Sequence, residues 1–400
     1  MKKVVLAFSG GLDTSYCAIY LSKDRGFDVH TLTVNTGGFS QAELKDIEVR
    51  ALGLGVASHA NVDETKAYYD QVIRFLVYGN VLKNGTYPLS VSAERMSQAL
   101  AVARYAKKIG ADAVAHGSTG AGNDQVRFDM IIQILAPGLE IITPIRDQKL
   151  SREAEIEYLK SKGIAYSAKK ATYSINKGLW GTSVGGKETL NSMGMLPEDA
   201  WPTPMTKEKP EEVILGFTKG ELTTIDDKKF SHPTEAILAL QTKAGAFGIG
   251  RDIHVGDTII GIKGRVGFEA AAPLLTIKAH HALEKHVLTK WQLSWKDQLA
   301  QFYGNWLHEG QYLDPVMRDM EAFLTRSQEH VTGTVSVTLY PYRFQINGIT
   351  SPYDLMSSKF GKYGEMNLGW TGDDVKGFTK IFGNQVAIHH QVKNEAENNK

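Results

Sequence analysis

Short apolar runs alternate with longer amphipathic stretches through residues 4–142, and this alternation restricts the fold more than any other feature. The apolar runs predict strands at residues 4–8, 29–34, 57–62, 113–115 and 140–142. Helical periodicity lies between them, at residues 13–21, 42–54, 64–78, 93–109 and 124–135. Strands that alternate with helices form a parallel sheet with helices on both faces. We therefore expect an α/β, doubly wound parallel sheet that binds ligands at the carboxyl edge of its strands.

After residue 150 the composition and the pattern of predicted elements change. Ser151 begins a predicted helix that runs to about residue 162, with acidic residues in its first turn. Residues 163–212 are rich in Gly, Ser, Lys and Pro, which predicts a crossing segment with little regular structure, typical of a functional loop or a linker. Further strands are predicted at 213–217, 221–225, 258–262, 334–339 and 343–346, and helices at 279–290, 293–308 and 315–327. The tail from residue 371 predicts one helix with a frayed polar end, so a second, α+β domain and a C-terminal helix follow the parallel sheet.

Composition limits the class of protein. A length of 400 residues favours two domains. The 45 basic and 44 acidic residues leave a net charge of +1, so we expect neither a nucleic-acid nor a membrane partner, whereas small anionic substrates stay possible. Cys17 is the single cysteine, which excludes an intrachain disulfide and predicts a small buried hydrophobe. The apolar run before Ser9 is too short for a signal peptide, and the sequence predicts a soluble cytoplasmic protein.

The first stretch that could carry chemistry is AFSGGLDTS, residues 7–15. Its glycines allow a sharp turn and close approach to a ligand, and the helix that follows directs free N–H groups at the loop. Together these features predict a phosphate cradle. The loop is neither GxxxxGK[ST] nor GxGxxG. A plain turn from strand to helix, with Asp13 or Thr14 as the N-cap, is the alternative.

The second stretch, HGSTGAGNDQVRFD at residues 116–129, follows the fourth predicted strand and so lies on the same sheet edge. Its Asn and Asp side chains can bind an ammonium or ureido group, and Arg127 can grip a carboxylate with two hydrogen bonds. A third stretch, YSINKGLWGTSVGG at residues 173–186, suits a small polar ligand but is by itself also typical of a linker.

Two other groups of residues favour structural roles. His280, His281 and His286 lack the HExxH spacing and are predicted as surface histidines of a helix. The residues Trp291, Trp295 and Trp306 are expected to pack in a core or a subunit contact rather than to stack on bases.

With these three stretches the chain resembles the argininosuccinate synthase family, which belongs to the ATP pyrophosphatases with an SGGxDS loop. GNDQVRF is the most specific of the shared motifs, and YS followed by LWGTS agrees with the third. The resemblance implies condensation of citrulline with aspartate, with ATP converted to AMP and pyrophosphate through a citrullyl-adenylate. It also implies Mg²⁺ on the phosphates and a homotetramer. The corresponding domains are an ATP-binding domain at 1–165, a synthetase and oligomerisation domain at 166–365, and a C-terminal helix and tail at 366–400.

The resemblance also assigns site residues in this sequence. The implied ATP-binding residues are Ala7, Phe8, Ser9, Gly10, Gly11, Leu12, Asp13, Thr14, Ser15, Val34 and Gly117. The implied aspartate-binding residues are Thr119, Asn123 and Asp124. The implied citrulline-binding residues are Tyr87, Ser92, Asn123, Arg127, Ser174 and Ser183. No catalytic acid, base or protein metal ligand is assigned, because positioning and charge stabilisation carry most of this chemistry.

Three positions depart from the pattern of the family. Ala121 stands where most relatives have Lys, so another Lys or Arg, or a metal ion, must supply a cation near the phosphates. Gly256 and Phe268 stand where the family usually has a Glu and a Tyr that contact citrulline. A modified citrulline is therefore one alternative substrate. A different ATP pyrophosphatase and a nucleotide-binding homologue without catalysis are the alternative functions.

Overall fold

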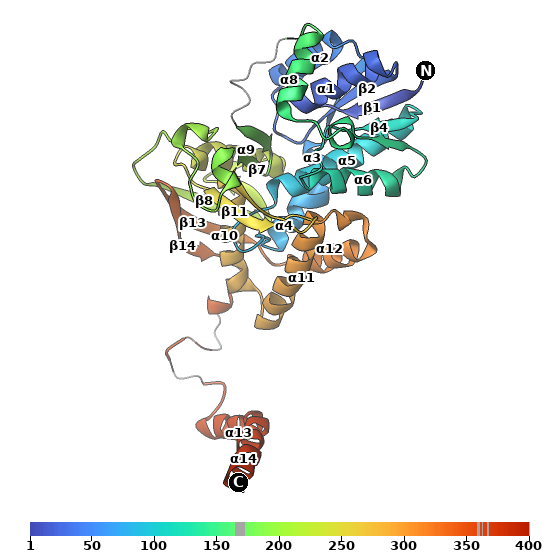
Figure 1. Ribbon diagram of the computed structural model, residues 1–400. Coiled ribbons are helices and arrows are strands. Elements are labelled where there is room, and N and C mark those ends of the chain that lie inside the picture. The colour runs from blue at the N-terminus through green and yellow to red at the C-terminus, as the bar shows by residue number, and fades with distance from the viewer. Residues whose placement is uncertain (165–172, 358–360, 362, 366–367, 400) are drawn as a thin grey trace. The chain divides into compact units, whose positions relative to one another are not determined.

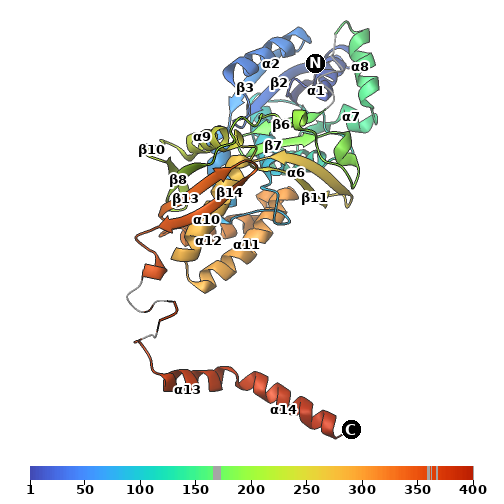
Figure 2. The same ribbon diagram turned by 90° about the vertical axis from the view of Figure 1, so that its left-hand side faces the viewer.

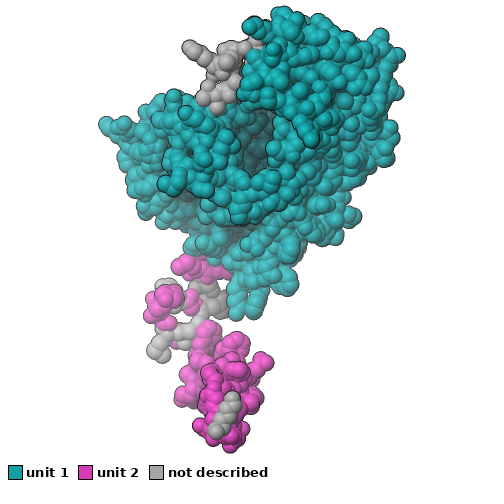
Figure 3. All heavy atoms as spheres, viewed as in Figure 1, with its two compact units in different colours: residues 1–352 teal, residues 353–400 magenta. Residues whose placement is uncertain are grey.

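The computed structural model describes residues 1–164, 173–357, 361, 363–365 and 368–399. The chain forms two compact units, residues 1–352 and residues 353–400 (Figure 3). Within the described residues no helix has the length and apolar character needed to cross a membrane.

A parallel five-stranded sheet forms the first part of the larger unit. Its strands are β1 (Lys3–Ala7), β2 (Asp28–Asn35), β3 (Ser58–Asp63), β4 (Ala113–Ala115) and β5 (Glu140–Ile142). Their order in the sheet is β3-β2-β1-β4-β5, and every pair is parallel. The strand order changes direction between β1 and β4. The predicted doubly wound α/β sheet is thereby confirmed, with strand bounds within a residue or so of the prediction.

Helices cover both faces of this sheet (Figures 1 and 2). On one face lie α1 (Leu12–Ile19, continued by a π-helical turn over Tyr20–Asp24), α2 (Gln41–Gly53) and α8 (Arg152–Ser161). On the other lie α5 (Ser90–Lys108) and α6 (Asp124–Leu135). Side chains of a strand alternate between the two faces, so Val4 and Leu6 of β1 join the core under α1, whereas Val5 joins the core under α5. Cys17 is buried in the first of these cores, as predicted.

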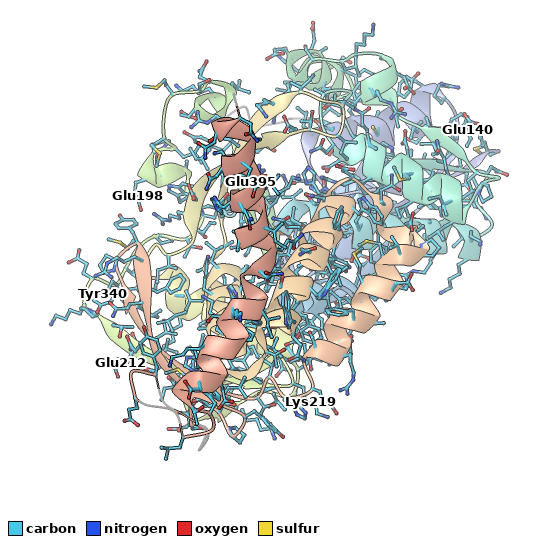
Figure 4. The ribbon with its side chains drawn as sticks, turned by 90° about the horizontal axis from the view of Figure 1, so that it is seen from below. Glu140, Glu198, Glu212, Lys219, Tyr340 and Glu395 are labelled. Atoms are coloured by element: carbon cyan, nitrogen blue, oxygen red, sulfur yellow. The ribbon has the colours of Figure 1, made fainter. Side chains whose placement is uncertain are left out.

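Shorter helical pieces connect these layers. The predicted helix at 64–78 is present as α3, a π-helical turn and α4, and α7 follows β5. Their bounds are α3 (Thr65–Tyr68), η2 (Tyr69–Ile73), α4 (Arg74–Tyr78) and α7 (Pro144–Asp147). At the edge of the sheet, Glu140 of β5 pairs with Lys2 (Figure 4).

The remainder of the larger unit holds two antiparallel sheets. One has the order β11-β12-β7-β6, with β6 (Ser174–Gly178), β7 (Gly181–Gly185), β11 (Arg251–Asp257) and β12 (Lys263–Glu269). The other has the order β10-β9-β8-β13-β14, with β8 (Glu211–Thr218), β9 (Glu221–Ile225), β10 (Lys228–Lys229), β13 (Gly333–Tyr340) and β14 (Arg343–Thr350). The strands predicted at 213–217, 221–225, 334–339 and 343–346 are confirmed, and they form two antiparallel hairpins.

Two predictions in this region are wrong. The described part of residues 163–212 is not largely irregular, because β6 and β7 form a hairpin and two 3₁₀ helices follow, at Lys187–Leu190 and Glu198–Ala200. Arg251 of β11 pairs with Glu198 of the second 3₁₀ helix, at 2.7 Å, which ties this segment to the sheet (Figure 4). Residues 258–262 form the turn between β11 and β12 rather than a strand, since the Thr258 N–H donates to the Ile262 carbonyl.

Helices α9 (Pro233–Gly245), α10 (Ala271–Val287), α11 (Lys290–His308) and α12 (Pro315–Ser327) complete the unit. His280 of α10 is fully buried, so its prediction as a surface histidine is wrong. Its ring is held by Asn80 and Gln328, in a polar network that also contains Glu284 and Lys296. Trp291 and Trp295 of α11 are exposed and do not pack in the core of this chain, whereas Trp306 packs against it.

The smaller unit contains a 3₁₀ turn (Leu355–Ser357) and the helices α13 (Gly372–Phe382) and α14 (Asn384–Asn398). The prediction of a single helix with a frayed end is wrong. The first helix ends at Phe382, and a second one continues from Asn384 through the polar residues to Asn398.

Candidate active site at the carboxyl edge of the parallel sheet

The first and second stretches of interest lie side by side because β1 and β4 are neighbours. Leu6 of β1 pairs with Ala115 of β4, so the loops that follow both strands begin at the same edge. A Cβ added to Gly117 would lie 3.1 Å from the Cβ of Asp13 and 3.3 Å from the Thr14 nitrogen. The second loop therefore contacts the first turn of α1, and glycine at 117 permits this approach. This is the point of the sheet at which α/β proteins bind ligands.

The first loop leaves the start of α1 without a side-chain cap. Gly10 has φ +73°, a conformation that favours glycine, and Gly11 is the N-cap residue. The alternative in which Asp13 or Thr14 caps the helix is therefore wrong. Ser15 does not cap the first-turn amides, because its Oγ donates to the Gly11 carbonyl at 2.7 Å. The first-turn amides of α1 thus remain available to an anion.

The helices on the same face as α1 provide a comparison. Ser40 caps α2 through the Glu43 N–H, and Ser151 caps α8 through the Ala154 N–H. By contrast, α1, α5 and α6 have no side-chain cap. Three uncapped helix starts in one region provide N–H groups and positive dipole ends for negatively charged ligands.

Two arginines accompany the loops. Arg50 of α2 donates from Nη1 to the Gly10 carbonyl at 2.5 Å. Arg146 of α7 donates to Asp129 at 2.7 Å, and its Cγ would lie 3.6 Å from a Cβ at Gly120. These guanidinium groups lie beside the phosphate cradle and the second loop, in the region where the Lys expected in place of Ala121 is missing.

A buried acid lies behind the first loop. Glu155 of α8 is 1% exposed, and its Oε2 has no hydrogen-bond partner among the described residues. Burial and the neighbouring carboxylate of Asp13 raise the pKa of Glu155 to about 8. Glu155 is therefore largely protonated at neutral pH, and it adds little negative charge below the cradle.

The second loop is organised by its own side chains. Gln125 donates to the carbonyls of Gly120 and Gly122, at 2.8 and 3.1 Å. Asn123 accepts the Ile259 N–H at 2.8 Å, which joins the loop to the turn between β11 and β12. Thr119 is exposed at the tip of the loop.

Asp124 lies between two arginines. It accepts from Arg95 Nε at 2.9 Å and from Arg127 Nη1 at 3.0 Å. Burial opposes ionisation of Asp124, but the two guanidinium groups outweigh it and hold its pKa below the usual value. Arg95 of α5 also donates to Asn176 of β6, at 2.7 Å. This bond connects the third stretch to the other two.

Arg127 is 2% exposed, and its guanidinium nitrogens donate hydrogen bonds to neighbouring residues. It donates to the His308 carbonyl and to Ser92 Oγ, the latter at 3.0 Å. The His308 Nδ1 lies 2.9 Å from the same Ser92 oxygen. Burial and the adjacent charges of Arg127 and Lys83 lower the pKa of His308 to about 3, so its ring is neutral at physiological pH.

The remaining residues predicted to bind citrulline differ in their exposure to solvent. Ser183 of β7 is buried, and its Oγ accepts from Asn176 at 3.4 Å. Ser174 is exposed at the start of β6. Tyr87 is buried, with its hydroxyl accepting the Val91 N–H at 3.0 Å and its ring stacked on His254, at 4.9 Å between centroids. Phe268 packs against the same tyrosine, at 5.3 Å.

The end of β2 lies at the same edge of the sheet. Val34 is buried there, and Thr36 donates to Glu94 of α5 at 2.7 Å. Gly37, with φ +89°, contacts Leu179, so β2 and the hairpin of β6 and β7 meet at this edge. The space-filling view shows a deep recess in the larger unit, in the area where Figure 1 draws β7 beside α3 (Figure 3).

Sequence reasoning missed several residues of this network. They are Glu94, Arg95, Asn176, His254 and His308, which come from α5, β6, β11 and the end of α11. Only Asn176 carried a signal, because it lies within the third stretch. The helical residues occupy ordinary amphipathic positions, and their meeting depends on packing between distant parts of the chain.

The fold and loops are those of a nucleotide-binding α/β protein, with a candidate anion site at the switch point of its parallel sheet. Comparison with known sequences identifies the protein family. A sequence profile described as the arginosuccinate synthase N-terminal HUP domain matches residues 3–165, and one described as the arginosuccinate synthase C-terminal domain matches residues 173–389. The chain belongs to the argininosuccinate synthase family, which confirms the resemblance read from the sequence.

Relatives from distant organisms align over nearly the full length. The argininosuccinate synthase of Methanocaldococcus jannaschii is 38% identical over 392 residues, which cover 97% of this chain and 98% of the relative. That of Xylella fastidiosa is 38% identical, with 98% of each chain covered. That of Dictyoglomus turgidum is 36% identical, with 97% of each chain covered.

Proposed function

We propose that this protein is an ATP-dependent C–N ligase that condenses the ureido group of citrulline with the amino group of aspartate to form argininosuccinate. ATP is cleaved between its α and β phosphates, and AMP and pyrophosphate leave. The observation that carries the proposal is the contact of Gly117 with the uncapped first turn of α1. Through this contact the proposed anion site touches the loop that contains GNDQVRF, which we assign to the two amino-acid substrates.

The division of labour follows from the two loops. We assign pyrophosphate to the amides of Ser9–Gly11 and the first turn of α1, with Ala7–Ser15, Val34 and Gly117 around the nucleotide. A ureido oxygen is a poor leaving group until it is adenylated, so the protein must hold that oxygen against the α-phosphate. Preorganised N–H donors then stabilise the charge that develops on the phosphates.

Magnesium fits this site as an ion held by the nucleotide. Groups of three or more His, Cys, Asp or Glu residues placed to hold a metal are absent from the described part of the chain. Mg²⁺ bound to nucleotides keeps several waters and takes most of its ligands from phosphate oxygens. Asp13 is the carboxylate at the cradle that could face such an ion, and the ion would supply charge neutralisation on the phosphates.

The substrate assignments remain those of the sequence. Thr119, Asn123 and Asp124 are proposed to bind aspartate, and the citrulline residues are Tyr87, Ser92, Asn123, Arg127, Ser174 and Ser183. The hydrogen bonds of Asp124 with Arg95 and Arg127 support a site that is rigid before substrate arrives. We also retain the domain division at residues 165 and 365.

The assembly is proposed to be a homotetramer in the cytoplasm. The helices α13 and α14 expose large apolar side chains, and α11 exposes two tryptophans. The exposed residues include Val375, Phe378, Ile381, Phe382, Val386, Ile388, Val392, Trp291 and Trp295. Such side chains are typical of surfaces that other subunits cover. The single, buried Cys17 is compatible with a reducing compartment.

One assay tests the function. Pyrophosphate release from ATP is measured with citrulline, with aspartate, with both and with neither. Release that requires a citrulline compound together with aspartate is the expected result. Release without dependence on aspartate would indicate a different ATP pyrophosphatase, and nucleotide binding without release would indicate a homologue that has lost catalysis.

A further inference from the structure

A cluster of hydrogen-bond donors surrounds the predicted citrulline residues at the end remote from the phosphate loop. It consists of Lys83, Arg127, His254 and His308, packed around Tyr87 and Ser92. Burial, and then the charge of Lys83, lower the pKa of His254. Burial, and then the charges of Arg127 and Lys83, lower the pKa of His308, so both rings are neutral at physiological pH. His254 is 5% exposed and stacked on Tyr87, and its Nδ1 has no hydrogen-bond partner among the described residues.

A buried polar atom without a partner is costly, and it points to a ligand group that completes the bond. The Nε2 of His308 is a second buried imidazole atom without a regular hydrogen bond in the described chain. Neutral imidazoles offer an N–H donor or a lone pair, and the adjacent Lys83 and Arg127 are cations. The cluster therefore suits oxygen acceptors and anions.

The same cluster offers little to an ammonium group. Asp124 is the partly buried carboxylate beside Arg127, and both of its oxygens already accept from arginines. The other carboxylates whose charges act on the cluster are those of Asp252, Asp257 and Glu309, all exposed residues, and Asp257 is paired with Lys263 at 2.6 Å. Placing an unpaired ammonium beside Lys83 and Arg127 would cost desolvation and charge repulsion together.

We infer that the citrulline bound here is acylated on its α-amino nitrogen, so that this end of the substrate presents a neutral amide, or an amide with an added carboxylate, in place of an ammonium. The inference rests on the proposed function. The acyl oxygen accepts from the imidazole of His254 or His308. A carboxylate on the acyl group, where there is one, faces Lys83.

Gly256 is part of this selectivity. A Cβ at this position would lie 2.4 Å from the Nε2 of His254. The ring of His254 therefore occupies the space into which a side chain at 256 would project, and no acidic side chain can enter there while the histidine stays in place. The ring of Phe268 packs against Tyr87, and this side chain has no hydroxyl to offer the cluster.

The test compares three substrates on the full-length protein. Pyrophosphate release is measured with ATP and aspartate plus citrulline, N-acetylcitrulline or N-succinylcitrulline. We expect kcat/KM to be at least about tenfold higher with one or both acylated compounds than with citrulline. Equal activity, or a preference for citrulline, would overturn the inference and leave the proposed function intact. Absence of release with all three compounds would instead refute the proposed function.

A double variant reverses the chemistry of the cluster. His254→Ala with Gly256→Glu removes the imidazole and supplies a carboxylate in its place. The expected result is a shift of the kcat/KM ratio toward citrulline by at least about tenfold, and a matching shift of dissociation constants measured calorimetrically. His281→Ala, on α10, is the matched histidine control and should leave the ratio unchanged. A double variant that folds, binds ATP and keeps the original ratio would contradict the role assigned to His254.

Discussion

The carboxylate of Asp124 holds two arginines in place, so its replacement should affect stability as well as aspartate binding. In Asp124→Asn the side chain keeps its shape and loses its charge. Arg95 Nε, at 2.9 Å, and Arg127 Nη1, at 3.0 Å, then lose the anion that both contact. Arg127 is 2% exposed, and its guanidinium therefore stays buried with reduced charge compensation.

The size of the effect follows from these two bonds. A hydrogen bond to a charged group contributes about 1.5–3 kcal/mol, and loss of one partner of a buried ion pair costs about 3–5 kcal/mol. The side chain of Asp124 is 34% exposed, and both arginines keep other acceptors, which favours the low end. We expect the free energy of unfolding to fall by about 3 kcal/mol, on the order of a hundredfold in the folding equilibrium.

Urea denaturation followed by circular dichroism measures this change, and aspartate and ATP titrations measure the functional one. Aspartate-dependent turnover should be lost, whereas ATP binding at the first loop should be retained. Glu48→Gln, which removes an exposed ion pair with Lys45 on α2, is the control and should change stability by less than about 1 kcal/mol. A change of similar size in both variants, or an equal loss of ATP affinity, would refute the reasoning about Asp124.

Two further predictions concern buried charges. Lys296→Met leaves Glu284 buried without its ammonium partner at 3.0 Å and should lower the unfolding free energy by about 3–5 kcal/mol in urea denaturation. The exposed Lys285→Met should be near neutral, and similar values for the two would contradict the prediction. Glu155 has a folded-state pKa raised from 4.5 to about 8, so its contribution to stability is fully present below pH 4.5 and is lost as pH rises toward 8. Glu155→Gln does not have this loss of stability. The difference in melting temperature between Glu155→Gln and the unaltered protein should therefore rise between pH 5 and pH 8. A constant difference would show that Glu155 titrates normally.

The parallel sheet could be predicted because its signal is local. Each strand of the first domain is a short apolar run flanked by a helical pattern, and parallel order then places every carboxyl end on one edge. The hairpin of β6 and β7 has no such signal. Its segments, SINKG and GTSVG, are polar and glycine-rich, and they become strands because β12 pairs with β7 along Thr182–Val184.

Some residues of the candidate site could likewise be predicted from the sequence, and others could not. Residues that lie in glycine-rich loops after strands could be found from the sequence, because loop position and side-chain type both point to ligands. His308 is the last residue of an amphipathic helix, and Arg95 is one of many charged residues on another. Their roles depend on the packing of α11 and α5 against α6. His280 shows the converse, since its place in a helix does not reveal that Asn80 and Gln328 bury it.

The two ends of the site handle charge by different means. The end proposed to bind phosphate presents main-chain amides of the loop after β1 and of the first turn of α1, whose dipoles do not depend on protonation. Glu155 nearby is largely protonated at neutral pH. The other end uses side chains in fixed pairs, in which Asp124 offsets part of the charge of two arginines and both histidines stay neutral. Such a site suits substrates that bring negative charge at both ends, as proposed here for ATP at the cradle and for a carboxylate of the acyl group beside Lys83.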